Sequence, residues 1–212
     1  MKIMNENQAV NILIPTEIEN LKLPNPELLG HYKDIENRVI WIDGDIDECV
    51  LQDVGGRILE YNREDKGKPI NDRKKIVILI NSGGGVLDST YATIAIIEKS
   101  KTPVITVNTS MAHSAAGLIL LAGHKRYCMP RSQMLIHSGS ASGISGNFED
   151  IQESTKAYKK MVEDMRAYII EKSKIDKALL TKKSKTDWYL TTDDMINLGC
   201  ADSILSDLDE IL

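Results

Sequence analysis

Short apolar runs alternate with stretches of helical spacing along most of the chain, and this alternation predicts its secondary structure. The apolar runs indicate buried strands at 38–42, 75–80, 104–108, 126–129, 133–137 and 201–205. Helical spacing covers 46–61, 88–100, the segment from Ser114 to Gly123 and the segment from Thr191 to Gly199. A buried strand that leads into a helix and then into another buried strand is typical of a parallel βαβ unit. The pattern therefore predicts an α/β fold.

One helical period is much longer than the others. It starts near Asn147 and runs for about 25 residues, which corresponds to nearly 40 Å of helix. Its apolar stripe consists of Phe148, Ile151, Thr155, Tyr158, Met161, Val162, Met165, Tyr168 and Ile169. Asn147 and Asp150 have the spacing of a helix cap. The pattern fits two arrangements, one in which the helix packs along the sheet and one in which it projects and pairs with a partner subunit.

Four segments show no sustained period. Residues 1–37 are expected to form an irregular N-terminal arm that contacts a neighbouring subunit or lies at an axial position. The charged stretch 62–75 predicts a solvated loop, and 179–187 is expected to be irregular. The Ser/Gly-rich run 138–146 predicts a mobile loop or an extended edge, because it offers few side chains for packing.

Composition and charge narrow the class of protein. The net charge is −5, and no cluster of basic residues with aromatic neighbours is present, which argues against a nucleic-acid partner. The three cysteines are widely spaced and odd in number, so a disulfide framework is not expected. No secretion signal and no apolar run of membrane-spanning length is found. We therefore expect a soluble cytoplasmic protein without a membrane partner.

Candidate chemistry begins at Ser114, where a β-branched run gives way to an apolar helix. A hydroxyl at a helix start lies beside unpaired backbone N–H groups that can stabilise a developing negative charge. The same position also suits a serine that only caps the helix, and both interpretations remain open at this point. His137 ends a strand and can serve as a base near pH 7.

A third member of a Ser-His-acid set is less well defined. Asp187 precedes the last helix, but several other acids lie close to it in sequence. These are Asp176, Asp193, Asp194 and Asp202. His113 and His124 are alternative bases that we interpret as structural or surface residues, and Cys128 is expected to pack in the core.

A triple-glycine turn follows the second predicted strand. Gly83, Gly84 and Gly85 lack a Cβ atom, so the backbone there can approach a substrate closely. The N–H of Gly85 and the N–H of Ala115 form a candidate pair of oxyanion donors. The turn lacks the spacing of a P-loop or a dinucleotide-binding loop.

Several segments in one order resemble the proteolytic subunit of the Clp protease family, a self-compartmentalising serine peptidase. The resemblance runs from about 38 to 205. The first two matching segments are 80–86 (Ile-Asn-Ser-Gly-Gly-Gly-Val) and Ser114 with the following helix, which ends Leu-Ala-Gly. The third is 129–137 (Met-Pro-Arg-Ser-Gln-Met-Leu-Ile-His). The last is 187–191 (Asp-Trp-Tyr-Leu-Thr), which is followed by Gly199 and by 202–205 (Asp-Ser-Ile-Leu).

The resemblance implies roles for particular residues. It implies Ser114 as nucleophile, His137 as general base and Asp187 as the acid that orients it, with oxyanion donors at Gly85 and Ala115. It implies a crotonase-like spiral of βαβ units with a handle helix over 147–172, within one domain covering 38–212. It also implies polypeptide substrates, no metal or organic cofactor, and a homo-oligomer of two stacked heptameric rings that works with an AAA+ unfoldase.

The chain departs from the family pattern at several places. Gly83 replaces a proline, Ala115 replaces a methionine, and Ser138-Gly139 follows His137 where Gln-Pro is usual. Residues 1–37 do not resemble the axial-loop segment that meets the unfoldase. These departures leave three alternatives, namely a phage capsid-maturation protease, a catalytically silent scaffold subunit and a crotonase-type acyl-CoA enzyme.

Overall fold

A computed structural model describes residues 28–140 and 145–212 of the chain. The chain divides into two compact units between Asp34 and Ile35, and the second unit, Ile35–Leu212, contains the sheet and all of the candidate site. Most of the predicted N-terminal arm, and residues 141–144 of the Ser/Gly-rich run, lie outside the described residues.

The second unit is built on a sheet that has seven strands among the described residues. Its main path has the order β1-β2-β3-β4-β7, with β5 beside the end of β3 and β6 beside β5. The bounds are β1 Val39–Asp43, β2 Ile76–Ser82, β3 Val104–His113, β4 Lys125–Cys128, β5 Gln133–Ile136, β6 Trp188–Leu190 and β7 Ser203–Ile204. All strand pairs are parallel except β5 with β6. The parallel strands put the carboxyl ends of β2, β3 and β5 at one edge.

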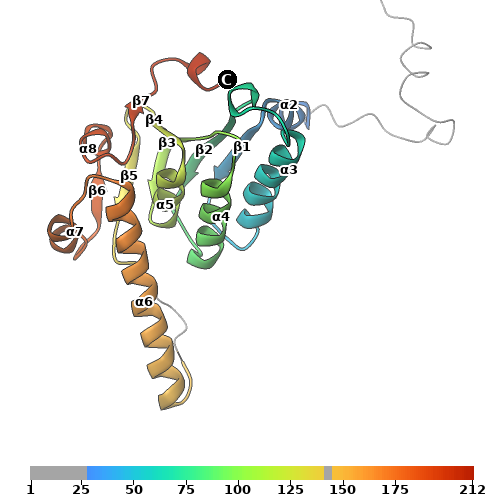
Figure 1. Ribbon diagram of the computed structural model, residues 1–212. Coiled ribbons are helices and arrows are strands. Elements are labelled where there is room, and N and C mark those ends of the chain that lie inside the picture. The colour runs from blue at the N-terminus through green and yellow to red at the C-terminus, as the bar shows by residue number, and fades with distance from the viewer. Residues whose placement is uncertain (1–27, 141–144) are drawn as a thin grey trace, which may run out of the picture. The chain divides into compact units, whose positions relative to one another are not determined.

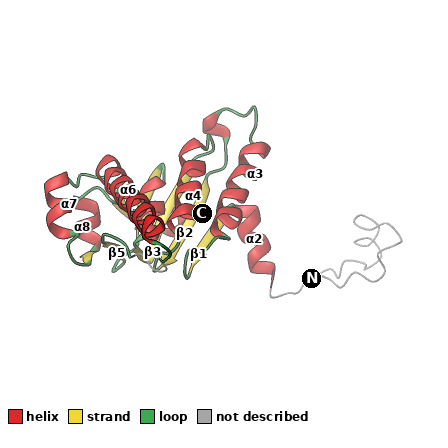
Figure 2. Ribbon diagram, turned by 90° about the horizontal axis from the view of Figure 1, so that it is seen from below, coloured by secondary structure: helices red, strands yellow, loops and turns green. Residues whose placement is uncertain are grey.

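Helices follow the strands as βαβ units require. Their bounds are α2 Leu29–Asn37, α3 Arg57–Glu64, α4 Leu87–Lys99, α5 Ala115–Ala122, α6 Phe148–Lys172, α7 Lys177–Lys183 and α8 Thr192–Asn197. A π-helical segment, Leu51–Gly56, leads into α3, and short 3₁₀ turns cover Ile70–Asp72 and Leu208–Glu210. Figure 1 shows α3, α4 and α5 together in front of the sheet, and Figure 2 shows α3 and α4 on one side of its strands.

The core lies between this helix layer and the sheet. Every residue of α5 is buried, which explains why the sequence has an apolar helix with no polar face there. A smaller apolar cluster on the other face of the sheet includes Val77, Val107 and Tyr127, and Ile211 from the C-terminal segment packs into it. The predicted α/β fold of βαβ units with a long helix is confirmed.

The long helix α6 begins as its sequence predicts. The Asn147 side chain accepts a hydrogen bond from the backbone N–H of Asp150, and the Asp150 carboxylate accepts one from the backbone N–H of Asn147. Within α6 only Met165 and Ile169 are buried, and both belong to its second half. The first half extends beyond the sheet, as Figure 1 shows. Of the two predicted arrangements, the structure has the one in which the helix projects from the sheet.

Three expectations about local structure were wrong. β3 continues to His113 instead of ending at 108, because its second half pairs with β5 although its own residues are largely polar. The segment 179–187 is not irregular throughout, since α7 begins at the Asp176 cap and reaches Lys183. Within the expected arm, Leu29–Asn37 is helical.

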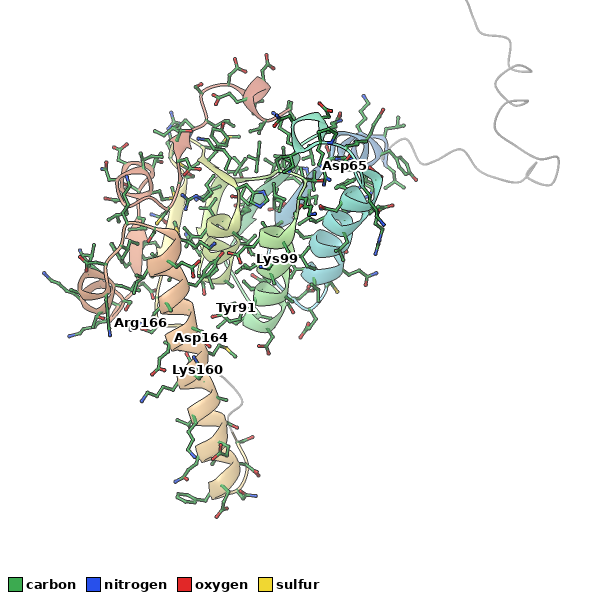
Figure 3. The ribbon with its side chains drawn as sticks, viewed as in Figure 1. Asp65, Tyr91, Lys99, Lys160, Asp164 and Arg166 are labelled. Atoms are coloured by element: carbon green, nitrogen blue, oxygen red, sulfur yellow. The ribbon has the colours of Figure 1, made fainter. Side chains whose placement is uncertain are left out.

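The charged stretch 62–75 also differs from the solvated loop that was expected. α3 extends into it as far as Glu64, and the carboxylate of Asp65 is fully buried. Figure 3 labels Asp65 at the end of α3. Arg38 lies 2.5 Å from it, and Lys68 and Thr102 also donate hydrogen bonds to it. These partners compensate the burial of a charge that the local sequence would place at the surface.

Candidate active site

Ser114 lies at the turn between β3 and α5 in an uncommon backbone conformation. Its φ of 54° and ψ of −122° place a non-glycine residue in the positive-φ region. Such strain persists where surrounding contacts hold it, and here the Ser114 N–H donates to the carbonyl of Leu135 at 2.9 Å. The hydroxyl makes no capping hydrogen bond to α5. Helix capping therefore does not account for this serine.

The imidazole of His137 meets the Ser114 hydroxyl, with Nε2 2.7 Å from Oγ. The sheet explains why residues so far apart in sequence come together. β3 and β5 are parallel neighbours with His113 beside Leu135, so Ser114 and His137 both follow strands that end at the same edge. This separation suits a hydrogen bond through which the hydroxyl proton can pass to the imidazole.

Asp187 lies on the other side of the imidazole. β6 runs antiparallel to β5 with Trp188 beside Ile136, which brings the residue before Trp188 close to His137. The distance from Asp187 Oδ1 to His137 Nδ1 is 3.9 Å, which is longer than a hydrogen bond, and the Asp187 side chain is 57% exposed. The acid is therefore near its expected partner but not in direct hydrogen-bond contact.

The neighbouring acids have other tasks. Asp176 caps α7, the Asp194 carboxylate accepts a hydrogen bond from the backbone N–H of Thr191 in the capping box of α8, and Asp202 forms an ion pair with Arg126 at 2.8 Å. Asp193 does not line the cleft that contains Ser114. Among these candidates Asp187 alone is placed within 4 Å of the His137 ring, a selection that sequence spacing could not make.

Two hydrogen bonds that the sequence did not indicate join the His137 segment to its surroundings. The Ser138 hydroxyl donates to the carbonyl of Ser184 at 2.8 Å, just before the segment that carries Asp187. The Tyr158 hydroxyl of α6 donates to the carbonyl of Ser138 at 3.4 Å. In the sequence, the only indication of these two contacts is the position of Tyr158 on the apolar stripe of α6. That position by itself indicates packing and not a hydrogen bond near His137.

The glycine turn after β2 packs directly against the nucleophile. A Cβ atom on Gly84 would lie 2.8 Å from Ser114 Cβ and 3.1 Å from the Ala115 nitrogen, and one on Gly85 would lie 1.9 Å from the Ile46 carbonyl oxygen. Both glycines have positive φ, +99° and +154°. Gly84 thus packs against Ser114, Gly85 lines the same cleft, and neither the N–H of Gly85 nor that of Ala115 has an acceptor in the part of the chain that the structure describes.

An open cleft of about 900 Å³ contains these groups. Its walls come from the glycine turn and the start of α4, from Ser114 and His137, and from α6. Residues from α6 that line it are Ser154, Ala157, Tyr158 and Met161. A cleft of this size is large enough for several residues of an extended peptide.

The other candidate groups are structural. His124 Nδ1 accepts a hydrogen bond from the Val104 N–H at 3.0 Å, and His113 packs edge-on against the Tyr189 ring. Burial is the main cause that lowers the pKa of both imidazoles. Burial raises the pKa of the Cys128 thiol to about 11, which keeps it protonated and unreactive near neutral pH.

Residues 28–140 and 145–212 contain neither a clustered metal-binding group nor a membrane-spanning helix. No group of three or more His, Cys, Asp or Glu side chains is arranged to hold a metal ion. No helix in these ranges has the length and apolar character needed to cross a membrane.

The fold and the cleft together define a class. This is an α/β protein in which a serine hydroxyl, an imidazole and backbone N–H groups converge at the carboxyl edge of a parallel sheet, an arrangement suited to acyl transfer. Comparison with known proteins then gives the family. The family model for Clp protease matches residues 30–207, so the chain belongs to the Clp protease family, and this membership implies a peptidase.

Individual relatives agree with this family. The chain is 26% identical over 195 residues to the ATP-dependent Clp protease proteolytic subunit 1 of Rhodococcus jostii, an alignment that covers 91% of this chain and 86% of the relative. It is 26% identical over 210 residues to the proteolytic subunit 2 of Mycobacterium leprae, covering 97% and 95%. The fold is similar to that of a ClpP1 mutant from Listeria monocytogenes, with a TM-score of 0.74 at 23% identity over 87% of this chain and all of that one.

Proposed function

We propose that this protein is a serine endopeptidase in which Ser114 is the nucleophile and His137 is its general base. The observation that carries the proposal is the 2.7 Å separation between Ser114 Oγ and His137 Nε2 inside the open cleft. Membership in a peptidase family supports it independently.

The reaction proceeds in two halves. His137 takes the proton from the Ser114 hydroxyl as Oγ attacks the peptide carbonyl, and the N–H groups of Gly85 and Ala115 hold the resulting oxyanion. The protonated imidazole then gives its proton to the leaving amine, which leaves an acyl-enzyme. Water, deprotonated by His137, cleaves the ester and restores Ser114.

Asp187 completes the set as the acid that orients and stabilises the imidazolium. The 3.9 Å gap between Asp187 Oδ1 and His137 Nδ1 closes by a small movement of an exposed side chain when the cleft is filled. Such tightening on substrate binding is common in hydrolase sites.

A fluorophosphonate probe, which reacts with activated serine hydroxyls, tests the chemistry. We expect covalent labelling of the full-length protein and loss of labelling in Ser114→Ala. Ser110→Ala is the matched control, because Ser110 is an exposed serine of the preceding strand β3 outside the cleft and its loss should leave labelling intact.

The outcome separates this proposal from its alternatives. A folded protein that no fluorophosphonate labels would contradict the proposal and favour a silent scaffold subunit. A crotonase-type acyl-CoA enzyme usually relies on a glutamate base, and no glutamate is among the described residues that line the cleft. The observations therefore do not support that alternative.

We also propose that the chain assembles into two stacked heptameric rings. The exposed apolar side chains of Phe148 and Ile151 on the projecting part of α6 support an interface there. Relatives are named as subunits of ATP-dependent proteases, which supports an AAA+ unfoldase as partner and polypeptides as substrates. Assembly, partner and cytoplasmic location all remain predictions.

A further inference from the structure

The wall of the cleft formed by the β1 end and the glycine turn is acidic. Asp45 and Asp88 both line the cleft that contains Ser114 and His137, and both are exposed to solvent. Asp45 precedes Ile46, whose backbone pairs with Gly85, and its Oδ1 lies 3.8 Å from where a Cβ of Gly83 would be. Asp88 lies in the first turn of α4, directly after that glycine turn. The two carboxylates therefore belong to the same cleft wall as the glycine turn.

No positive side chain offsets them in the cleft. Among the described residues that line it, the charged and titratable side chains are Asp45, Asp88, His137 and the weakly acidic Tyr158, with no lysine or arginine. Ser114 is uncharged, and so are the other residues of α6 that line the cleft, Ser154, Ala157 and Met161. The inner surface of the cleft thus has a net negative charge beside the reacting groups.

The segment that leads into this wall increases the negative charge. Residues 43–48 read Asp-Gly-Asp-Ile-Asp-Glu, with four carboxylates and no basic side chain. Within this segment the Asp47 carboxylate accepts a hydrogen bond from the Cys49 N–H at 2.8 Å and is the largest cause that raises the pKa of the Cys49 thiol. The acidic character therefore extends from the cleft to its rim.

The wall formed by α6 does not neutralise the negative charge of Asp45 and Asp88. Two lysines of α6 are paired on the helix surface, Lys160 with Asp164 and Lys156 with Glu153, each at 2.5 Å. Figure 3 shows Lys160 and Asp164 one turn apart on α6. Ion pairs within one helix leave little net charge to act across the cleft. Lys159, on the same helix, does not line the cleft.

From this arrangement we propose that the cleft selects polypeptides with a lysine or arginine side chain within a few residues of the bond that is cleaved, through Asp45 and Asp88. The inference rests on the proposed peptidase function and adds the substrate class. Because both carboxylates are exposed, each contributes modestly. We expect about a threefold preference from one carboxylate and about tenfold from both, as exposed ion pairs allow.

Internally quenched peptides that differ at one position test the proposal. The full-length protein is assayed with peptides carrying Lys, Gln or Glu two residues before the cleaved bond, and with a second set carrying them two residues after it. We expect kcat/KM to follow the order Lys, Gln, Glu in at least one set. Raising the salt concentration to about 1 M, where charges are screened beyond about 3 Å, should reduce the ratio.

Variants assign the preference to the two carboxylates. Asp45→Asn, Asp88→Asn and the double variant should reduce the Lys to Gln ratio of kcat/KM stepwise. Asp72→Asn is the matched control, because Asp72 is an exposed aspartate outside the cleft and should leave the ratio unchanged.

The possible outcomes are distinct. Cleavage that depends on Ser114 but shows no preference for Lys over Gln in either set overturns this inference and leaves the peptidase proposal intact. A preference that persists unchanged in the double variant also overturns it. Absence of both cleavage and fluorophosphonate labelling would instead contradict the proposed function.

Discussion

Arg38 and Asp65 show at the residue scale how a surface-like sequence can form part of the interior. Asp65 is fully buried and Arg38 nearly so. Arg38 has a positive φ of 59°, and its side chain reaches Glu64 and Asp65 at the end of α3. The Arg38 guanidinium is the largest cause that holds the pKa of the Asp65 carboxyl well below its usual range, with help from Lys68 and Thr102. The pair joins the start of β1 to the end of α3.

Asp65→Ala should lower the free energy of unfolding by about 2–4 kcal/mol at pH 7, because it leaves the buried Arg38 charge with fewer partners. Glu64→Gln is the matched control. Glu64 also pairs with Arg38, but its side chain is 52% exposed, so the loss should stay below about 1 kcal/mol. Urea denaturation measures both, and equal losses would contradict this account.

The same carboxyl predicts a pH dependence. Because the folded state lowers the pKa of Asp65, its contribution is fully present above the unfolded value of about 4 and is lost as the pH falls toward the folded value. The stability difference between wild type and Asp65→Ala should therefore be constant from about pH 6 to 8 and shrink below about pH 4. Denaturation series across this range measure it, and a difference that grows in acid would contradict the assignment.

Ser138 connects two segments of the candidate active site through one hydrogen bond. Its hydroxyl holds the carbonyl of Ser184 and thereby fixes the segment before Asp187 against the segment that carries His137. Ser138→Ala should lower kcat about fivefold, an effect in the range of one neutral hydrogen bond, with little change in KM. Ser138→Thr retains the hydroxyl and should restore most of the rate.

At the element scale, the turn between β2 and α4 contains three glycines that differ in how much space a side chain would have. A Cβ on Gly85 would overlap the Ile46 carbonyl oxygen at 1.9 Å, whereas one on Gly83 would meet nothing closer than 3.8 Å. Gly83 also lacks the positive φ of its two neighbours. The glycine that replaces the family's proline is therefore the one least required by local sterics.

Gly85→Ala should reduce peptidase activity at least about 100-fold, because the turn must move and the N–H beside Ser114 moves with it. Gly83→Ala is the matched control and should retain activity within about threefold. Peptide hydrolysis together with the circular dichroism of both variants separates a displaced donor from a misfolded protein. Equal activity in the two variants would argue against Gly85 as an oxyanion donor.

At the scale of the whole molecule, the projecting part of α6 is the feature that a single chain leaves unexplained. Phe148 is 69% exposed and Ile151 40% exposed on its first two turns, although both belong to the apolar stripe of the sequence. Apolar side chains at regular helical spacing on a protruding helix are typical of a surface that another subunit covers.

The assembly prediction follows from this surface. Light scattering should give about 330 kDa, which is fourteen times the chain mass of 23.6 kDa. A double variant, Phe148→Glu with Ile151→Glu, should shift the mass toward half of that value if α6 joins two rings. Glu149→Lys, a charge change on the same turn at an exposed residue, is the control and should have a much smaller effect. A wild-type protein that remains monomeric would contradict the proposed rings.

Features that depend on local burial could be predicted from the amino-acid sequence. The presence of strands β1 to β5, the helix α6 with its Asn147 cap, the position of Ser114 before an apolar helix and that of His137 after a strand all follow from periodicities that a short window contains. Parallel pairing then required the two strand ends to share an edge. The resemblance to one family added Asp187, which no local pattern distinguished from its neighbours.

Features that depend on pairing between distant segments could not be predicted in this way and are known from the folded chain. Polar residues in the second half of β3 hid its extension to His113, which forms because β5 pairs with it. The burial of Asp65 depends on Arg38, 27 residues away. The 3.9 Å gap at Asp187 and the position of Asp45 beside the glycine turn depend on contacts across the sheet. Such distances cannot be predicted from the local sequence, because they depend on how whole helices and strands pack against one another.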